Sequence, residues 1–352
     1  MTSRLHNVSC ETFQYHDNAR GDTPAYRFSV APMMERTDRH YRRMARLMTR
    51  RTLLYTEMIT TGAIIHGDRA RLLEIDPIEK PISLQLGGDD PIEIAESIRI
   101  ASQYGYDEFN LNVGCPSDRV QHANFGACLM ADPPKVARIV EAMKSATDLP
   151  VTVKHRVGID GRETYEQMVS FVKTVASAGA DRFSVHARIA ILDGLSPKEN
   201  RTVPPLRYED VYRLKRENPD LVVEINGGIT TIDDVLEHLI YVDGVMVGRA
   251  AYDNPFMLAA IDSVVFGDPA STITRGDVVR SMTPYIAECS ERGMNPTPVI
   301  HHLLGIFAHR PGTRKWKQQL SGRRIEPAVA ALAVARALEA VPADTANETA
   351  VN

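Results

Sequence analysis

Residues 151–188 read VTVKHRVGIDGRETYEQMVSFVKTVASAGADRFSVHAR, and this stretch contains one copy of the unit that decides the fold. Two short and nearly continuous apolar runs, 151–156 and 182–188, are typical of strands that are covered on both faces. The segment between them, 165–179, has the spacing of an amphipathic helix. It ends in Gly179, which adopts a left-handed C′ conformation without a Cβ penalty. The stretch therefore predicts a strand, a helix and a second strand in succession.

The same alternation extends from residue 28 to residue 250. Six further apolar runs bounded by turn residues are predicted as strands: 28–33, 53–58, 82–88, 108–115, 221–228 and 244–250. Helices are predicted between them, for example over 91–105 and over 133–146, where Asp132 is the N-cap. Eight strands alternating with helices match a (β/α)8 TIM barrel. A doubly wound open sheet is the alternative, but it predicts a glycine-rich loop after the first strand, and APMMERTD (31–38) contains no glycine.

The chain is predicted to have four parts. Residues 1–24 form a polar N-terminal extension, and residues 25–262 form the catalytic barrel. Beyond residue 262 helical patterns follow one another without strands, which indicates a small helical domain over 263–341. We expect the polar tail 342–352 to be disordered.

The composition limits the class of protein. Of the 352 residues, 43% are hydrophobic and 24% are charged, and no apolar run reaches the length of about 18 residues that a membrane span needs. The first 24 residues lack the apolar core of a secretory signal. The four cysteines show no disulfide framework and no metal-ligand spacing, so we expect a cytoplasmic protein without a metal, and we expect a monomer. The net charge of −4 does not exclude a nucleic-acid partner, because a local basic patch is sufficient.

Polar and reactive side chains follow several of the predicted strands, where chemistry is located in such barrels. Cys115 is the most informative of them, because it stands between Gly114 and Pro116 directly after an alternating run. Most free cysteines are buried core residues, and a lone lysine or histidine has an ordinary structural explanation. The convergence of many such groups at one end predicts an active site. The residues are Gln85, Asn110, Asn112, Cys115, Lys154, His155, Arg156, His186 and Arg188.

Two glycine-containing strand ends indicate the ligand class. Asn226-Gly227-Gly228 and Gly248-Arg249 follow the last two strands, where this fold usually binds phosphate. Flavin mononucleotide (FMN) fits such a site, and Lys154 offers a cation to the reduced ring. APMM (31–34) passes under the flavin or is a core strand with adaptable methionines. No metal motif and no nucleophile-elbow motif for a Ser/His/Asp triad occurs in the sequence.

The motifs, taken in order, resemble those of the tRNA-dihydrouridine synthases over about residues 24–340. The most specific element is NLNVGCPS (110–117), which is followed by Phe125-Gly126-Ala127, and LSPKENRTVPPLRY (195–208) resembles the A-type subgroup. The other matching motifs are APMMERTD (31–38), ISLQLGG (82–88), VKHRVGID (153–160), VHAR (185–188), INGGI (225–229) and VMVGRAAYDNP (245–255).

The resemblance implies reduction of the C5–C6 double bond of uridine in the tRNA D-loop, at positions 20 and 20a, with NADPH as reductant and FMN as cofactor. It implies that a hydride goes to C6 and that Cys115 protonates C5, so the thiol is expected to be neutral. Asn112 is expected to orient the uracil edge. The implied FMN contacts are Pro32, Met33, Met34, Gln85, Lys154, His186, Asn226, Gly227, Gly228, Gly248 and Arg249.

Basic residues outside the barrel motifs are expected to bind the tRNA phosphates. The segment 309–324 contains six basic residues and no acidic one, and we expect Arg314 and Lys317 to contact RNA. Lys198 and Arg201 resemble a second RNA contact of the subgroup. Trp316, the single tryptophan, is predicted to be a core residue.

Two alternatives remain open from the residues alone. An FMN-dependent dihydroorotate-type dehydrogenase acting on a free pyrimidine shares the flavin residues and Cys115, but it needs no basic helical appendage. An RNA-binding protein on a degenerate barrel needs no flavin at all.

Overall fold

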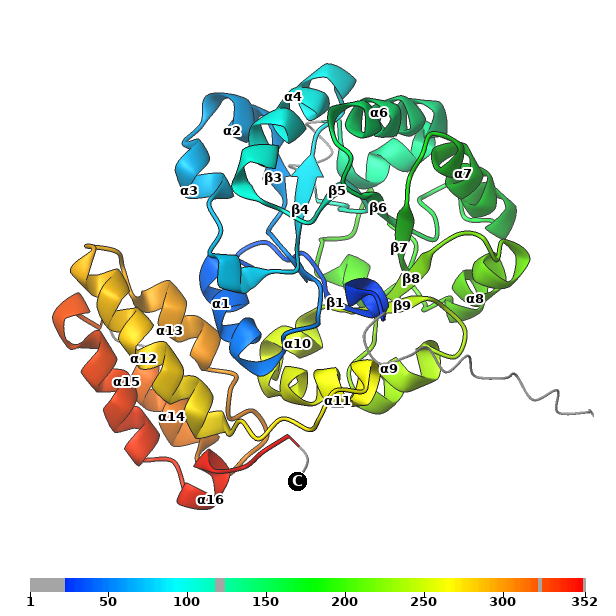
Figure 1. Cartoon of the computed structure of the whole chain (residues 1–352). Helices are drawn as coiled ribbons and strands as arrows, with labels where there is room; N and C mark the ends of the chain where they lie inside the picture. The colour runs from blue at the N-terminus through cyan, green and yellow to red at the C-terminus, as the bar shows by residue number, and fades with distance from the viewer. Residues whose placement is uncertain (1–22, 118–123, 322–324, 351–352) are drawn as a thin grey trace, which may run out of the picture.

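Parallel strands surround a common axis in the computed structural model, which describes residues 23–117, 124–321 and 325–350 (Figure 1). The strand order is β1-β9-β8-β7-β6-β5-β4-β2, and a bridge between Ser29 and Leu53 joins the two ends of this order. The predicted (β/α)8 barrel is confirmed. The strands are β1 Phe28–Val30, β2 Leu54–Tyr55, β3 Ile59–Thr60, β4 Ile82–Gly87, β5 Glu108–Val113, β6 Val151–Arg156, β7 Arg182–His186, β8 Val223–Asn226 and β9 Gly244–Val247.

Helices cover the outside of the barrel and bury their apolar faces against the strands (Figure 1). Asp132 caps α6 through the N–H of Lys135, as predicted, and Gly179 has φ +99 after the end of α7. The helices of the barrel are α1 Arg39–Met48, α2 Thr61–His66, α3 Arg69–Leu73, α4 Pro91–Ala101, α6 Pro133–Ala146, α7 Tyr165–Ser177, α8 Tyr208–Glu217, α9 Ile232–His238, α10 Arg249–Asp253 and α11 Ile261–Phe266.

The second strand differs from its prediction. The single strand expected over 53–58 is two short strands, β2 and β3, which both pair with β4. The break has a local cause, because the N–H of Gln85 donates to the hydroxyl of Thr56 at 3.1 Å instead of continuing the backbone ladder.

The amino-terminal mouth of the barrel is closed by the short 3-10 helix η1, Ala25–Arg27. The guanidinium of Arg182, at the start of β7, lies 4.7 Å from the centre of the Tyr26 ring. The Arg27 guanidinium donates to the carbonyls of Val242 and Asp243, just before β9. The functional groups therefore have to be sought at the opposite, carboxyl-terminal mouth.

The C-terminal part is a group of helices beside the barrel: α12 Arg275–Glu291, α13 Thr297–Leu303, α14 Thr313–Leu320, α15 Ala330–Glu339 and α16 Ala343–Ala346 (Figure 1). Trp316 is fully buried there, as predicted, and its Nε1–H donates to the carbonyl of Leu303 at 3.1 Å. The domain boundary expected at residue 262 lies inside α11. Asp262 is buried and accepts hydrogen bonds from Thr49 and from the N–H of Arg50, so the barrel extends through α11 to Phe266.

The prediction of a disordered tail over 342–352 is wrong for residues 342–350. The Glu348 carboxylate lies 3.2 Å from the Arg275 guanidinium and 2.6 Å from that of Arg310. A bridge also pairs Thr349 with Thr274. These contacts fix the polar segment against the helical domain, although its low hydrophobicity alone predicts a disordered tail. Residues 351–352, like residues 1–22 of the predicted extension, lie outside the described residues.

Among the residues that the structure describes, no helix is long and apolar enough to cross a membrane.

Candidate active site

Cys115 follows β5 at the carboxyl-terminal mouth, and the backbone on both sides of it is held by hydrogen bonds. The side-chain oxygen of Asn112 accepts the N–H of Gly114 at 3.0 Å and the N–H of Cys115 at 3.1 Å. The Cys115 carbonyl accepts the N–H of Ala127 at 2.9 Å. The thiol is partly exposed, with its sulfur 3.4 Å from the Ser117 hydroxyl. The cysteine is therefore placed for chemistry on a fixed backbone.

Arg156 was predicted at the mouth without a role of its own, and the structure makes it a positioning group. It is buried at the end of β6, and its Nε donates to the Gly114 carbonyl at 3.0 Å. Its Nη1 donates to the carbonyls of Ile189 and Asn200 at 3.0 and 2.9 Å. Arg156 therefore ties the Cys115 loop to the loop after β7. The only signal in the sequence was a third basic residue in the strand end KHR.

Gln85 and Asn112 lie side by side on β4 and β5, as the predicted site requires. Asn112 Nδ2 donates to Gln85 Oε1 at 3.1 Å and to the sulfur of Met58 at 3.2 Å. Both lone-pair directions of Asn112 Oδ1 are taken by the N–H groups of the Cys115 loop. The Asn112 amide has no polar atom left for the uracil contact expected from the sequence, so the geometry favours a role in holding the loop.

Lys154 and Asn226 were predicted from different strands, and the structure brings them into contact. Lys154 Nζ donates to Asn226 Oδ1 at 3.2 Å, and Asn226 Nδ2 donates to the Met246 carbonyl at 2.8 Å. Burial lowers the pKa of Lys154 to about 8, and the nearby positive charge of Arg156 acts in the same direction. Lys154 is therefore a cation at neutral pH, and no carboxylate of the described residues forms an ion pair with it.

His186, at the end of β7, is held in its neutral form. Burial lowers the pKa of His186 well below its usual value, and the positive charges of Arg156 and Lys154 lower it further. Its Nδ1 atom is buried and has no hydrogen-bond partner among the described residues. A buried polar atom without a partner is unfavourable unless a ligand completes it. A polar group of a ligand at the mouth would give this atom a partner.

The two glycine-containing strand ends lie next to each other, because β8 and β9 are paired. Gly227 and Gly228 have φ +110 and +75, a region that side chains rarely adopt. A Cβ on Gly228 would come within 2.6 Å of Leu206 and 2.7 Å of the Tyr208 hydroxyl. The Tyr208 hydroxyl in turn donates to the Gly227 carbonyl at 2.7 Å. Only glycine fits this turn, because Leu206 and Tyr208 already occupy the space that a side chain would need.

Positive charge collects at the same corner. Gly248 leads into α10, and Arg249 Nη2 lies 3.4 Å from the Arg201 carbonyl, to which it donates. Burial lowers the pKa of Arg201, and the like charges of Arg249 and Arg36 lower it further. Arg36 pairs with Asp253 at 3.4 Å, whereas Arg201 and Arg249 have no ion-pair partner among the described residues. Such cations at a mouth attract an anion such as a phosphate. Arg249 was predicted to contact the cofactor and Arg201 to contact the RNA, and in the structure the two residues are in contact.

The segment 31–34 borders this corner as a loop. β1 ends at Val30, and a Cβ on Gly248 would lie 3.8 Å from the Met33 sulfur. Pro32 and Met33 are partly buried, but Met34 is 57% exposed. Of the two interpretations of APMM, the core strand is wrong, because the strand stops before Ala31.

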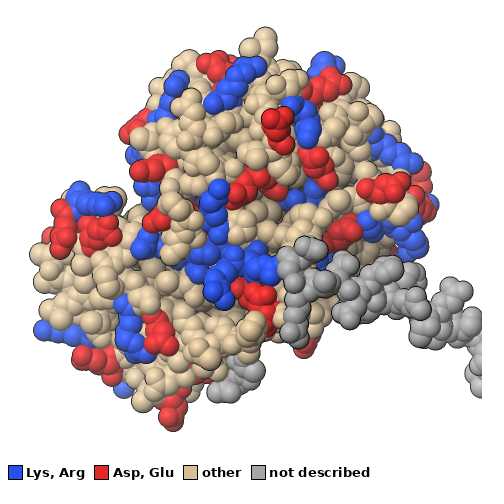
Figure 2. Space-filling view, viewed as in Figure 1, with Lys and Arg blue, Asp and Glu red and all other residues tan. Residues whose placement is uncertain are grey.

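The residues expected to bind RNA lie in two places. Arg314 and Lys317 are exposed on α14 and have no ion-pair partner among the described residues. Lys198 and Arg201 are exposed in the loop after β7, at the barrel mouth. Two basic residues of the 309–324 segment, Arg323 and Arg324, lie outside the described residues. On the face shown in Figure 2, both signs of charge are mixed, so an RNA surface depends on local groups.

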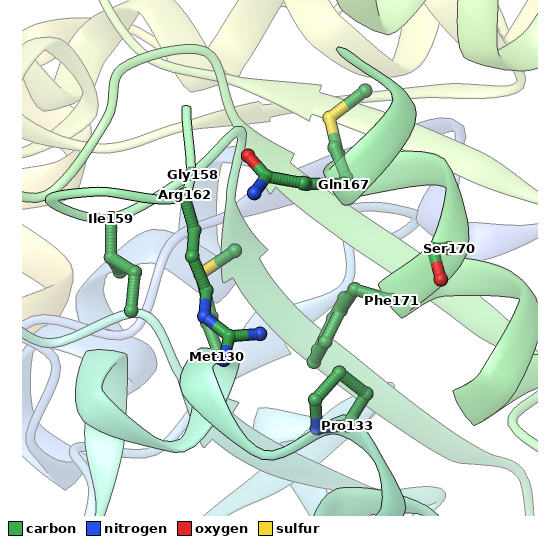
Figure 3. Close-up of a pocket in the computed structure, with 9 residues that line it drawn as sticks. Met130, Pro133, Gly158, Ile159, Arg162, Gln167, Ser170 and Phe171 are labelled. Atoms are coloured by element: carbon green, nitrogen blue, oxygen red, sulfur yellow. The ribbon is translucent and has the colours of Figure 1, made fainter. Parts of the chain in front are cut away.

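Two cavities lie away from the predicted residues. One of about 90 Å³ is lined by residues that include Met130, Ile159, Arg162, Gln167 and Phe171 (Figure 3). It has room for only a few water molecules, since each occupies about 30 Å³. The other, of about 310 Å³, lies between the barrel and the helical domain, and the Arg275–Glu348 pair lines it. Neither contains a residue predicted for the site.

The chain matches known proteins over most of its length. The family model described as "Dihydrouridine synthase (Dus)" matches residues 29–340. The tRNA-dihydrouridine(20/20a) synthase of Synechocystis sp. is 57% identical over 293 residues, which is 83% of this chain and 88% of that protein. The protein of the same name from Pseudomonas aeruginosa is 54% identical over 295 residues, covering 84% and 89%.

A solved structure of a 2-naphthoyl-CoA reductase complex is similar in fold alone. It is 12% identical, with a TM-score of 0.50, and the match covers 69% of this chain and 50% of that one.

Proposed function

This chain belongs to the dihydrouridine synthase family, and on that basis we propose that it reduces the C5–C6 double bond of uridine in tRNA, at D-loop positions 20 and 20a. Both curated relatives described above carry these positions in their names, and each match covers more than four fifths of both chains. The single observation that carries the chemistry is the position of Cys115. Its thiol is partly exposed at the barrel mouth, and its backbone is fixed by Asn112 and Ala127.

We propose that the mouth binds FMN and that NADPH is the reductant. The residues fit the group, because Gly228 is exposed after β8 and Arg249 follows the neighbouring strand β9. The buried Nδ1 of His186 lacks a partner, and Lys154 offers a cation to an electron-rich ring. We assign Pro32, Met33, Met34 and Gln85 to the same binding site. When bound, the reduced flavin supplies the hydride that C6 of uracil receives.

Cys115 supplies the proton. As C6 gains a hydride, negative charge develops at C5 and O4, and the Sγ–H bond breaks while a C5–H bond forms. The thiolate left on Cys115 regains its proton from solvent. Asn112 and Arg156 hold the loop during this transfer, and proton donation of this kind contributes about 10²–10⁴-fold to the rate.

The tRNA is held by its phosphates. Extruding a uridine from the folded RNA costs a few kcal/mol, and contacts to phosphate offset that cost. Lys198 and Arg201 at the mouth, and Arg314 and Lys317 on α14, are the exposed cations that we assign to this role. We propose that the protein acts as a cytoplasmic monomer.

Mapping of dihydrouridine in tRNA from cells that lack this protein tests the proposal. We expect dihydrouridine to be absent at positions 20 and 20a and to reappear when the wild-type gene is restored. An unchanged map would contradict the assigned positions. Binding of purified protein to tRNA is expected to weaken steeply with added salt, whereas binding to a free pyrimidine would not.

A further inference from the structure

A continuous chain of side-chain hydrogen bonds runs through the barrel from its floor to the Cys115 loop. It starts at a buried carboxylate near the amino-terminal mouth and ends at a backbone N–H at the carboxyl-terminal mouth. Its members, in spatial order, are Glu108, Thr152, Asn110, Gln85, Asn112 and Cys115.

The lower half of the chain starts from Glu108. The Thr152 hydroxyl donates to the Glu108 carboxylate at 3.1 Å, and Asn110 Nδ2 donates to the Thr152 hydroxyl at 2.8 Å. Gln85 Nε2 then donates to Asn110 Oδ1 at 2.8 Å. All four residues are at most 5% exposed, so water does not replace these partners. The strand register supports the chain, since Asn110 pairs with Gln85 on one side and with Thr152 on the other.

Both ends of the chain fix the direction of every bond. A carboxylate only accepts, and a backbone N–H only donates. Arg182 holds the carboxylate in place, with Nη2 at 2.7 and 2.8 Å from its two oxygens. Each amide between the ends therefore has one allowed orientation. Turning one of them would place two donors or two acceptors against each other along the chain.

We propose that Glu108 and Thr152 are positioning residues for the Cys115 loop, although they lie at the barrel floor and in its wall. They set the orientation of the Asn110 and Gln85 amides, and through them direct the Asn112 oxygen to the N–H of Cys115. If Thr152 cannot accept, Asn110 Nδ2 loses its partner, and the three amides are fixed only from the Cys115 end. The Asn112 oxygen is then held less firmly against the N–H groups of the loop. Only the assignment of the thiol as proton donor rests on the proposed function.

The test compares Thr152→Val, Thr152→Ser and Ser83→Ala in the purified flavin-bound protein. Valine keeps the shape of threonine but breaks the chain, and serine restores the hydroxyl. Ser83 is the matched control, because its buried hydroxyl on β4 has no hydrogen-bond partner among the described residues. The readouts are the rate at which iodoacetamide alkylates Cys115, followed by peptide mass spectrometry, and the rates of flavin reduction and of uridine reduction in a single turnover.

We expect Thr152→Val to change the alkylation rate at least about threefold and to slow uridine reduction about tenfold, with flavin reduction unchanged. Thr152→Ser and Ser83→Ala should resemble the wild type. A wild-type alkylation rate in Thr152→Val would overturn the proposal. If alkylation changes but uridine reduction does not, the positioning role stands and the proton-donor role of Cys115 fails.

A measurement on the wild type covers the case in which Thr152→Val does not fold. If these hydrogen bonds hold the loop, the Cys115 amide should exchange its hydrogen at least about 100-fold more slowly than an unprotected amide, although the loop lies at the mouth. Exchange at the rate of an unprotected amide would show that the chain does not hold the loop.

Discussion

Replacing Lys154 with methionine should stabilise the flavin-free protein, because the lysine is a buried cation kept for a ligand. Its pKa is lowered by burial from 10.5 to about 8. At about 1.4 kcal/mol per pH unit, this difference sets an upper limit of about 3.5 kcal/mol on the destabilisation. Part of the side chain is exposed, and solvent reduces the effect, so we expect Lys154→Met to raise the free energy of unfolding at pH 7 by about 1–3 kcal/mol.

The sign follows from the protonation states of the two forms. Below pH 8 Lys154 is protonated in the folded and in the unfolded protein, so the destabilisation is fully present. Between pH 8 and 10.5 the folded protein releases the proton while the unfolded chain keeps it, so the wild type gains stability as pH rises. The difference from Lys154→Met should therefore shrink over this range.

Urea unfolding at several pH values between 6.5 and 10 measures this difference. Lys173→Met, at an exposed position on α7, is the control and should leave the free energy of unfolding unchanged at every pH. FMN binding should weaken in Lys154→Met and stay normal in Lys173→Met. A wild type that is as stable as Lys154→Met at pH 7, with no relative gain above pH 8, would refute the view that this ammonium group is desolvated.

Three further substitutions test the site. Cys115→Ala should keep bound FMN and NADPH oxidation but lose uridine reduction at least about 100-fold, and full activity on tRNA would contradict the acid role. Lys317→Ala should raise the Kd for tRNA about threefold to tenfold at low salt, whereas Lys173→Ala should not; equal effects of the two would argue against an RNA surface on α14. Gly228→Ala should lower stability by about 1–3 kcal/mol and release flavin. Gly161→Ala is the control, because Gly161 has a similar φ of +71 but open space where a Cβ would lie. Equal losses of stability in the two variants would show that backbone strain, not the close approach of Leu206, limits position 228.

The alternation of strands and helices was predictable because it depends on neighbours in the sequence. The helix over 133–146 and the strand over 151–156 were predicted with the bounds that the structure shows. Errors arose where distant residues decide the conformation. The tail at 342–350 is held by Arg275 and Arg310, and no local pattern reports on those partners.

Much of the candidate site was predictable because the barrel brings the carboxyl ends of its strands together. Lys154 and Asn226 were named from separate motifs, and they are in contact in the structure. The role of Asn112 was not predictable, because its four hydrogen bonds form with residues as far apart as Met58 and Cys115. The role of Arg156 was not predictable for the same reason, since its partners are backbone carbonyls on two loops.

By itself, the sequence determined that a cysteine stands at the end of the fourth predicted strand of a barrel, because strand periodicity and a Gly-Cys-Pro turn are local properties. Only the tertiary structure decided how that cysteine is held. Hydrogen bonds between side chains depend on the register of neighbouring strands, and Thr152 meets Asn110 across 42 residues of chain. The Cys115 loop is therefore positioned by residues from β4, β5 and β6, whose proximity exists only once these strands have paired in the folded protein.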